Sequence, residues 1–188
     1  MTAKRRAGPA VPADDPREPG TPHAPIVSSA HLAAGGSPAL SELEFGLMLA
    51  VRGFERWVVR CMAAAGVPNL SPLEVVILHI VRHRERAKSC ADICLILDIE
   101  EAHVATYALR KLEQAGLIRT RKAGKEKLVE ATAAGIEACS RYAALREQLL
   151  VKSVRGAGPS EQVLSDAGEA LRAVSGFFNQ AARAAATL

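Results

Sequence analysis

Residues 89–131, SCADICLILDIEEAHVATYALRKLEQAGLIRTRKAGKEKLVEA, hold three consecutive patterns that decide the fold. Residues 89–97 form a short apolar run typical of one helix, and residues 98–100 read as a tight turn. Residues 101–115 carry the apolar spacing of a second, longer helix, which Gly116 ends. Two strand-like runs then follow on either side of a short turn, so the stretch predicts two helices joined by a turn and a hairpin directly after them.

Two short helices joined by a turn of this length define a helix-turn-helix, and a hairpin directly after it makes a winged helix. The second helix has one face spaced for a core, with Ala105, Ala108, Leu109 and Leu112. Its opposite face carries His103, Thr106, Tyr107, Arg110 and Lys111. We therefore expect a mainly α fold with a small β wing, in which the polar face of this helix is exposed.

That face has the chemistry of a helix that reads DNA. Residues near the start of such a helix reach base edges in the major groove, so His103 and Thr106 are expected to read donors and acceptors there. Tyr107 suits a thymine methyl group or a phosphate, and Arg110 and Lys111 suit phosphates.

The hairpin is basic. It carries Arg119, Arg121, Lys122, Lys125 and Lys127 against one acid, Glu126, and is expected to lie along a phosphate backbone. A second basic run, with Arg82, Arg84, Arg86 and Lys88, precedes the helix-turn-helix. Glu100 and Glu101 oppose this charge at the start of the second helix, where they favour the helix dipole but repel phosphates.

Long helical patterns flank this core. Residues 39–65 are apolar on several sides, which predicts a helix buried on more than one face, with Ser41 and Glu44 as its capping box. Ser71 and Pro72 open a helix that runs to about residue 83, with Leu73, Val76, Leu78, Ile80 and Val81 as its core.

Two helices complete the chain. The first, over residues 133–153, is expected to point Ile136, Cys139, Tyr142, Leu145 and Leu149 inward. The second begins at Ser160 and has an apolar stripe of Leu164, Ala167, Leu171, Val174, Phe178 and Ala182. A partner subunit is a natural cover for these apolar faces, and symmetric dimers are the common oligomer.

The expected organisation has four parts. Residues 1–38, rich in Pro, Gly and Ala, form a disordered tail; residues 39–70 form an N-terminal dimerisation helix; residues 71–132 form the winged helix; and residues 133–188 form C-terminal dimerisation helices. A 49% share of hydrophobic residues with only 4% aromatics favours helices, and a sequence pI near 9.0 fits a nucleic-acid partner.

Residues 104–118, VATYALRKLEQAGLI, together with this element order, resemble the MarR family of winged-helix transcriptional regulators. The resemblance implies a homodimer that binds double-stranded DNA, with no cofactor. It also implies a small aromatic effector in a cleft between the dimerisation helices and the winged helix, which Leu47, Phe54, Trp57 and Val76 would line. The sequence departs from the family at the wing tip, where Lys125, Glu126 and Lys127 replace its usual Asp-x-Arg, and at Ala131, which replaces a leucine before Thr132.

Two other functions are compatible with these patterns. A winged helix that binds protein instead of DNA is one alternative, and an oxidant-sensing repressor that uses Cys61, Cys90 or Cys94 is another. His79 and His83 have the spacing of two metal ligands, but no further ligand completes a site. Phosphate loops, nucleophile elbows and paired catalytic carboxylates are absent from the sequence, so we expect no enzyme. Neither a long apolar run nor a signal peptide is present, and the expected location is the cytoplasm.

Overall fold

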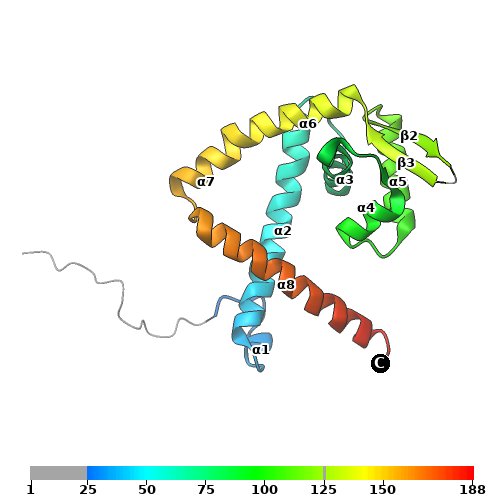
Figure 1. The fold of residues 1–188 in the computed structure, drawn as a ribbon. Helices are drawn as coiled ribbons and strands as arrows, with labels where there is room; N and C mark the ends of the chain where they lie inside the picture. The colour runs from blue at the N-terminus through cyan, green and yellow to red at the C-terminus, as the bar shows by residue number, and fades with distance from the viewer. Residues whose placement is uncertain (1–24, 125) are drawn as a thin grey trace, which may run out of the picture. The chain divides into compact units, whose positions relative to one another are not determined.

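The computed structural model describes residues 25–124 and 126–188, and its contacts group the chain into two compact units, residues 1–52 and 53–188. The elements in chain order are α1 (Ala30–Ala33), α2 (Pro38–Ala64), α3 (Pro72–Arg82), the 3-10 turn η1 (His83–Glu85), β1 (Lys88–Ser89), α4 (Cys90–Leu97), α5 (Ala102–Gln114), β2 (Ile118–Ala123), β3 (Glu126–Ala131), α6 (Ala133–Arg146), the π-helical turn η2 (Glu147–Val151), α7 (Lys152–Ala157) and α8 (Glu161–Ala185) (Figure 1). The fold is thus mainly helical with one small sheet, as expected.

The first unit holds α1 and the beginning of α2. The prediction of a capping box at Ser41 and Glu44 is wrong, because α2 begins at Pro38 and Ser41 lies inside it. The hydroxyl of Ser41 instead donates a hydrogen bond to the Leu32 carbonyl at 3.0 Å, which ties α1 to α2. Helix α1 falls within the tail that we expected to be disordered, whereas residues 1–24 of that tail lie outside the described residues.

The second unit begins its winged helix with two capped helices. At α3 the Glu74 N–H donates to Ser71 Oγ at 3.3 Å, and the Ser71 N–H donates to Glu74 Oε2 at 2.9 Å. Ser89 and Asp92 repeat this reciprocal arrangement at α4. Asp98, with φ 53°, ends α4 in a left-handed conformation. The helices predicted from residues 71, 89 and 101 are confirmed, each to within a residue or two.

The sheet has the strand order β1-β3-β2, and all its pairs are antiparallel. Strands β2 and β3 form the predicted hairpin, with Ile118 opposite Ala131 at its base and Ala123 opposite Glu126 next to its turn. Strand β1 was not predicted: it is only two residues long and pairs Lys88 with Val129. Two residues are too short for any alternating pattern to appear in the sequence.

The core joins the end of α2 to α3, α4, α5, the base of the wing and α6. On α3, Leu78 and Val81 are buried as expected, but Leu73, Val76 and Ile80 are only half-buried. Val75 and Ile77 are fully buried in their place. The difference arises because α3 packs against α5, α6 and β3 together, so its buried residues do not follow a single face.

The C-terminal helices leave much apolar surface uncovered. Helix α6 continues through η2 and α7 to Ala157, and on it Cys139 and Tyr142 are buried while Ile136 and Leu149 are exposed, contrary to expectation. Helix α8 buries none of its residues, although its apolar stripe runs along its whole length. Within the described part of the chain, no helix combines the length and the apolar content that crossing a membrane requires.

Candidate nucleic-acid interface

Helix α5 presents two faces of opposite character. Ala105, Ala108, Leu109 and Leu112 are buried, as predicted, and pack into the core beside α3 and α4. The side chains on the other face, His103, Thr106, Tyr107 and Arg110, are exposed, and Tyr107 keeps 61% of its surface accessible. The helix therefore offers a continuous polar face that the fold itself does not use.

Two of these side chains have local partners. Thr106 Oγ1 donates to the Ala102 carbonyl one turn earlier at 2.8 Å and lies 3.8 Å from Cys90 Sγ on α4. His103 Nε2 lies 3.3 Å from Glu101 Oε2, and both groups are largely exposed. Glu101 is the residue before α5, and its side chain makes no capping hydrogen bond to the helix.

Lys111 differs from its neighbours on this face. Its ammonium lies 2.9 Å from Oε1 of Glu74 on α3, and Glu74 is only 2% exposed. Burial would raise the pKa of Glu74, but hydrogen bonds from Ser71 and Lys111 and the charge of Lys111 outweigh it, so the pKa lies below its ordinary value. The same hydrogen bond and charge raise the pKa of Lys111. Part of the charge that we assigned to phosphates is therefore held by a buried carboxylate.

The passage from α5 into the wing is closely constrained. Gly116 adopts φ 70°, which a glycine allows without strain. The Thr120 N–H donates to Glu113 Oε1 at 2.9 Å, so the last turn of α5 holds the first residues of β2.

A threonine and a glycine close the far end of the wing. Thr132 Oγ1 donates to the Gly116 carbonyl at 2.7 Å and accepts the Gly135 N–H at 3.1 Å. A Cβ placed on Gly135 would lie 2.1 Å from the Leu117 carbonyl oxygen, so only glycine fits there. These two residues fix the start of α6 against the base of the wing.

Not all the basic side chains of the hairpin are free to contact DNA, because two of them lie beside a carboxylate. Arg119 Nε lies 2.7 Å and Arg121 Nε 3.6 Å from the carboxylate of Glu130, a residue that lies beyond the basic run in the sequence. Lys122 and Lys127 stand directly opposite each other across the two strands, and both are exposed. Lys125 lies outside the described residues. The two facing lysines thus give the wing its most concentrated positive charge in the described part.

The basic run before the helix-turn-helix does not join this surface. Lys88 is 9% exposed, and its ammonium donates to the carbonyls of His83 at 2.8 Å and Arg86 at 3.0 Å. Arg86 lines a small cavity with Glu130 and Ala131, at the end of β3 remote from the turn of the wing. Lys88 is therefore a structural residue that shapes the loop, and Arg86 lies at the base of the wing.

Three of the four residues assigned to an effector cleft, Leu47, Phe54 and Trp57, lie on α2, and Val76 lies on α3. Trp57 packs edge-on against Tyr142 of α6, with ring centroids 6.4 Å apart. A cavity of about 690 Å³ in the second unit is lined by none of these four side chains. The assignment of this cleft stays a prediction.

The cysteines and the histidine pair have ordinary surroundings. Burial raises the pKa of Cys139 to about 11, and burial with the neighbouring Cys90 raises the pKa of Cys94, so both thiols hold less thiolate than a free cysteine. The ring of His79 packs edge-on against Tyr142 at 4.6 Å. Among the described residues, no group of three or more Cys, His, Asp or Glu side chains is placed to hold a metal ion.

The family profile described as a winged helix DNA-binding domain matches residues 70–135. A comparison with curated protein sequences finds no match.

Solved structures extend the likeness beyond the winged helix. A MarR family transcription regulator is 17% identical, covers 81% of this chain and 98% of its own, and superposes with a TM-score of 0.61. A mutant MarR from E. coli complexed with operator DNA is 14% identical, covers 72% of this chain and 94% of its own, and superposes with a TM-score of 0.60. CouR from Rhodococcus jostii RHA1 bound to p-coumaroyl-CoA is 16% identical, covers 73% of this chain and 95% of its own, and superposes with a TM-score of 0.56. Residues 70–135 thus match the winged helix DNA-binding domain family, and the chain that carries them has the fold of the MarR-family transcription regulators.

Proposed function

We propose that this protein is a sequence-specific DNA-binding transcriptional regulator that acts as a homodimer in the cytoplasm, and that it is not an enzyme. The observation that carries the proposal is the pairing of an exposed polar face on α5 with a basic hairpin directly after it. A helix with one buried and one unused polar face is the part of a winged helix that enters the major groove.

In this proposal the two parts of the surface have different tasks. His103, Thr106 and Tyr107 contact base edges from the first turns of α5, and Arg110 contacts a phosphate. Lys122 and Lys127, with Lys125, follow the backbone beside the groove. Arg119, Arg121 and Lys111 contribute less, because Glu130 and Glu74 already share their charge.

The homodimer rests on uncovered apolar surface. On α8 the side chains of Val163, Leu164, Leu171 and Phe177 are between 39% and 70% exposed, and on α2 those of Met48, Leu49, Val51 and Phe54 are between 44% and 57% exposed. This many large apolar side chains left exposed on two helices are typical of surfaces that bind another protein chain. We therefore assign residues 39–70 and 133–188 to dimerisation and residues 71–132 to DNA.

A response to a small molecule completes the proposal. CouR, which shares the fold, was solved bound to p-coumaroyl-CoA, and this supports an effector of some kind for the present chain.

The test is selection of DNA from a random pool by the purified protein, combined with its mass in solution. A dimer that enriches a palindrome with half-sites one helical turn apart would support the proposal, because two winged helices related by a twofold axis read such a sequence. A dimer that enriches no sequence even at low salt would overturn it in favour of a winged helix that binds a protein partner.

A further inference from the structure

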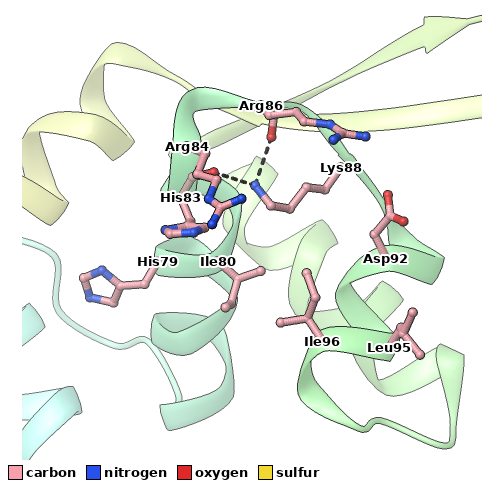
Figure 2. A pocket seen from close by; sticks show the side chains of 9 residues that line it. All are labelled: His79, Ile80, His83, Arg84, Arg86, Lys88, Asp92, Leu95 and Ile96. Atoms are coloured by element: carbon pink, nitrogen blue, oxygen red, sulfur yellow. Dashed lines mark hydrogen bonds between the residues drawn. The ribbon is translucent and has the colours of Figure 1, made fainter.

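The second unit contains an open cavity of about 690 Å³ that the DNA surface does not use. The cavity lies between α3, η1, the loop after it, β1 and α4, and is lined by His79, Ile80, His83, Arg84, Arg86, Lys88, Asp92, Leu95 and Ile96 (Figure 2). None of these residues belongs to α5 or to the wing hairpin. The volume lies within the roughly 300–1,000 Å³ typical of small-molecule sites.

One side of the cavity is apolar and unusually exposed. Leu95 keeps 83% and Ile96 52% of its surface accessible, although both belong to a short helix in the middle of the winged helix. Figure 2 shows both side chains on α4, across the cavity from the loop that carries the arginines, with Ile80 on α3 beside them. An apolar group that covered Leu95 and Ile96 would remove this surface from water.

The opposite side of the cavity is cationic, and the buried side chain of Lys88 holds the loop that forms it. The buried ammonium of Lys88 donates to the carbonyls of His83 and Arg86, as the dashed lines in Figure 2 mark, and so fixes the backbone on either side of Arg84. Arg84 itself adopts φ 59°. Burial lowers the pKa of Lys88 most, and the charges of Arg86 and Arg84 lower it further, while the charge of Asp92 opposes them.

Arg84 and Arg86 are exposed, and among the described side chains neither guanidinium forms a hydrogen bond or a close ion pair, although the charge of Arg86 acts on Asp92. The one carboxylate in the lining, that of Asp92, already accepts the Ser89 N–H at 2.9 Å. The lining thus contains three cationic side chains, those of Arg84, Arg86 and Lys88, and one carboxylate, so its net charge is positive.

We propose that this cavity binds a small molecule with an anionic group and an apolar body. The anion lies against Arg84 and Arg86, and the apolar body covers Leu95, Ile96 and Ile80. The site lies within the winged helix and not in the cleft that the family resemblance implied. Its role as the effector site rests on the proposed function, because a molecule lodged between α3 and α4 bears on the helix that supports α5.

The test uses two fluorescent probes and the full-length protein without DNA. Anilinonaphthalene sulfonate carries an anionic group on an apolar body, and N-phenylnaphthylamine has the same body without the charge. Arg84→Gln with Arg86→Gln is expected to weaken binding of the sulfonate about tenfold and to change binding of the neutral probe less than about twofold. Leu95→Asn with Ile96→Asn is expected to weaken both probes, and these exposed positions can change without loss of the fold.

The matched control is Arg172→Gln with Arg183→Gln, which removes two exposed charges from α8 and is expected to leave both affinities unchanged. Equal sulfonate binding by the wild type and the Arg84 and Arg86 variant would overturn the proposal, as would an equal loss in the α8 control. Because no DNA is present, these outcomes are independent of the proposed function. If the protein binds the probe but no DNA, the proposed ligand site stands and the proposed function as a DNA-binding regulator is refuted.

Discussion

The ammonium of Lys111 on α5 lies 2.9 Å from the carboxylate of Glu74 on α3, and this ion pair joins the proposed recognition helix to the helix that supports it. Glu74 also closes the capping box of α3, so one carboxylate serves both helices. The pair adds a polar link between the two helices to the packing of the buried apolar face of α5.

Lys111→Met is expected to destabilise the fold more than Lys111→Met combined with Glu74→Gln. The single substitution leaves a buried carboxylate without its partner, whereas the double substitution removes the charge as well. Urea denaturation of both variants, with Glu74→Gln to complete the cycle, measures the difference. Free energies that simply add across the cycle would show that the two groups do not interact.

Gly135→Ala is expected to lower the free energy of unfolding by about 1–3 kcal/mol, the usual cost of forcing an extra carbon into a packed site. The new Cβ would meet the Leu117 carbonyl oxygen at 2.1 Å, so the start of α6 must move away from the wing. Gly156→Ala is the matched control, because nothing lies within 4 Å of a Cβ at that position. Equal stability of the two variants in urea would contradict the packing of α6 against the wing.

Stability is expected to fall as the pH is lowered from about 7.5 to 5.5, partly because of His79. Burial, and then the charge of Arg82, lower the pKa of His79, and its Nε2 is buried without a hydrogen-bond partner in the described part of the chain. The unfolded chain therefore binds a proton near the ordinary pKa of 6.5, while the folded chain does so only at lower pH. Across that window the unfolded state gains protons first, and the fold loses stability.

The matched variant is His79→Phe, which keeps a ring against Tyr142 and removes the titrating group. Its stability is expected to change less than that of the wild type between these two pH values. The other histidines are common to both proteins, so the difference isolates His79. An identical pH dependence in thermal melts of both proteins would refute this role.

Lys122→Ala with Lys127→Ala is expected to weaken binding to any DNA and to reduce the slope of log affinity against log salt by about two units, one for each phosphate that a lysine no longer neutralises. The two lysines face each other across the hairpin, where like charges repel and a phosphate between them relieves the repulsion. Arg119→Ala, at a residue already paired with Glu130, is expected to change the slope less. An unchanged slope in the lysine variant would place the backbone contact elsewhere.

Sequence patterns were sufficient for the elements whose signal is local. The cap at Ser71, the short helix over residues 89–97, the buried face of α5 and the hairpin all follow from residues within one or two turns of each other, whereas the capping box of Ser89 and Asp92 was not predicted. The misplaced start of α2 shows the limit of such reasoning, because Ser41 has the sequence of a cap but bonds to α1 instead.

Contacts between distant residues could not be predicted. Glu74 and Lys111 are 37 positions apart, and nothing in either local pattern marks them as partners. In the sequence Lys88 looks like one more surface cation. In the structure it is buried, and it lies in a two-residue strand that is recognised only by its pairing with β3. Glu130 follows the basic run and so escapes its charge count, although it lies opposite Arg119 in the strand register. In each case the fold decides which charge is used internally and which remains for a partner.

Binding of DNA by α5 and the wing is tested by the affinity of the purified protein for DNA from its own upstream region at two salt concentrations. We expect tight binding that weakens as salt rises, a clear preference over scrambled DNA of equal length, and loss of that preference in Tyr107→Ala. Equal, weak binding to both DNAs by a folded protein, unaffected by Tyr107→Ala, would contradict this expectation.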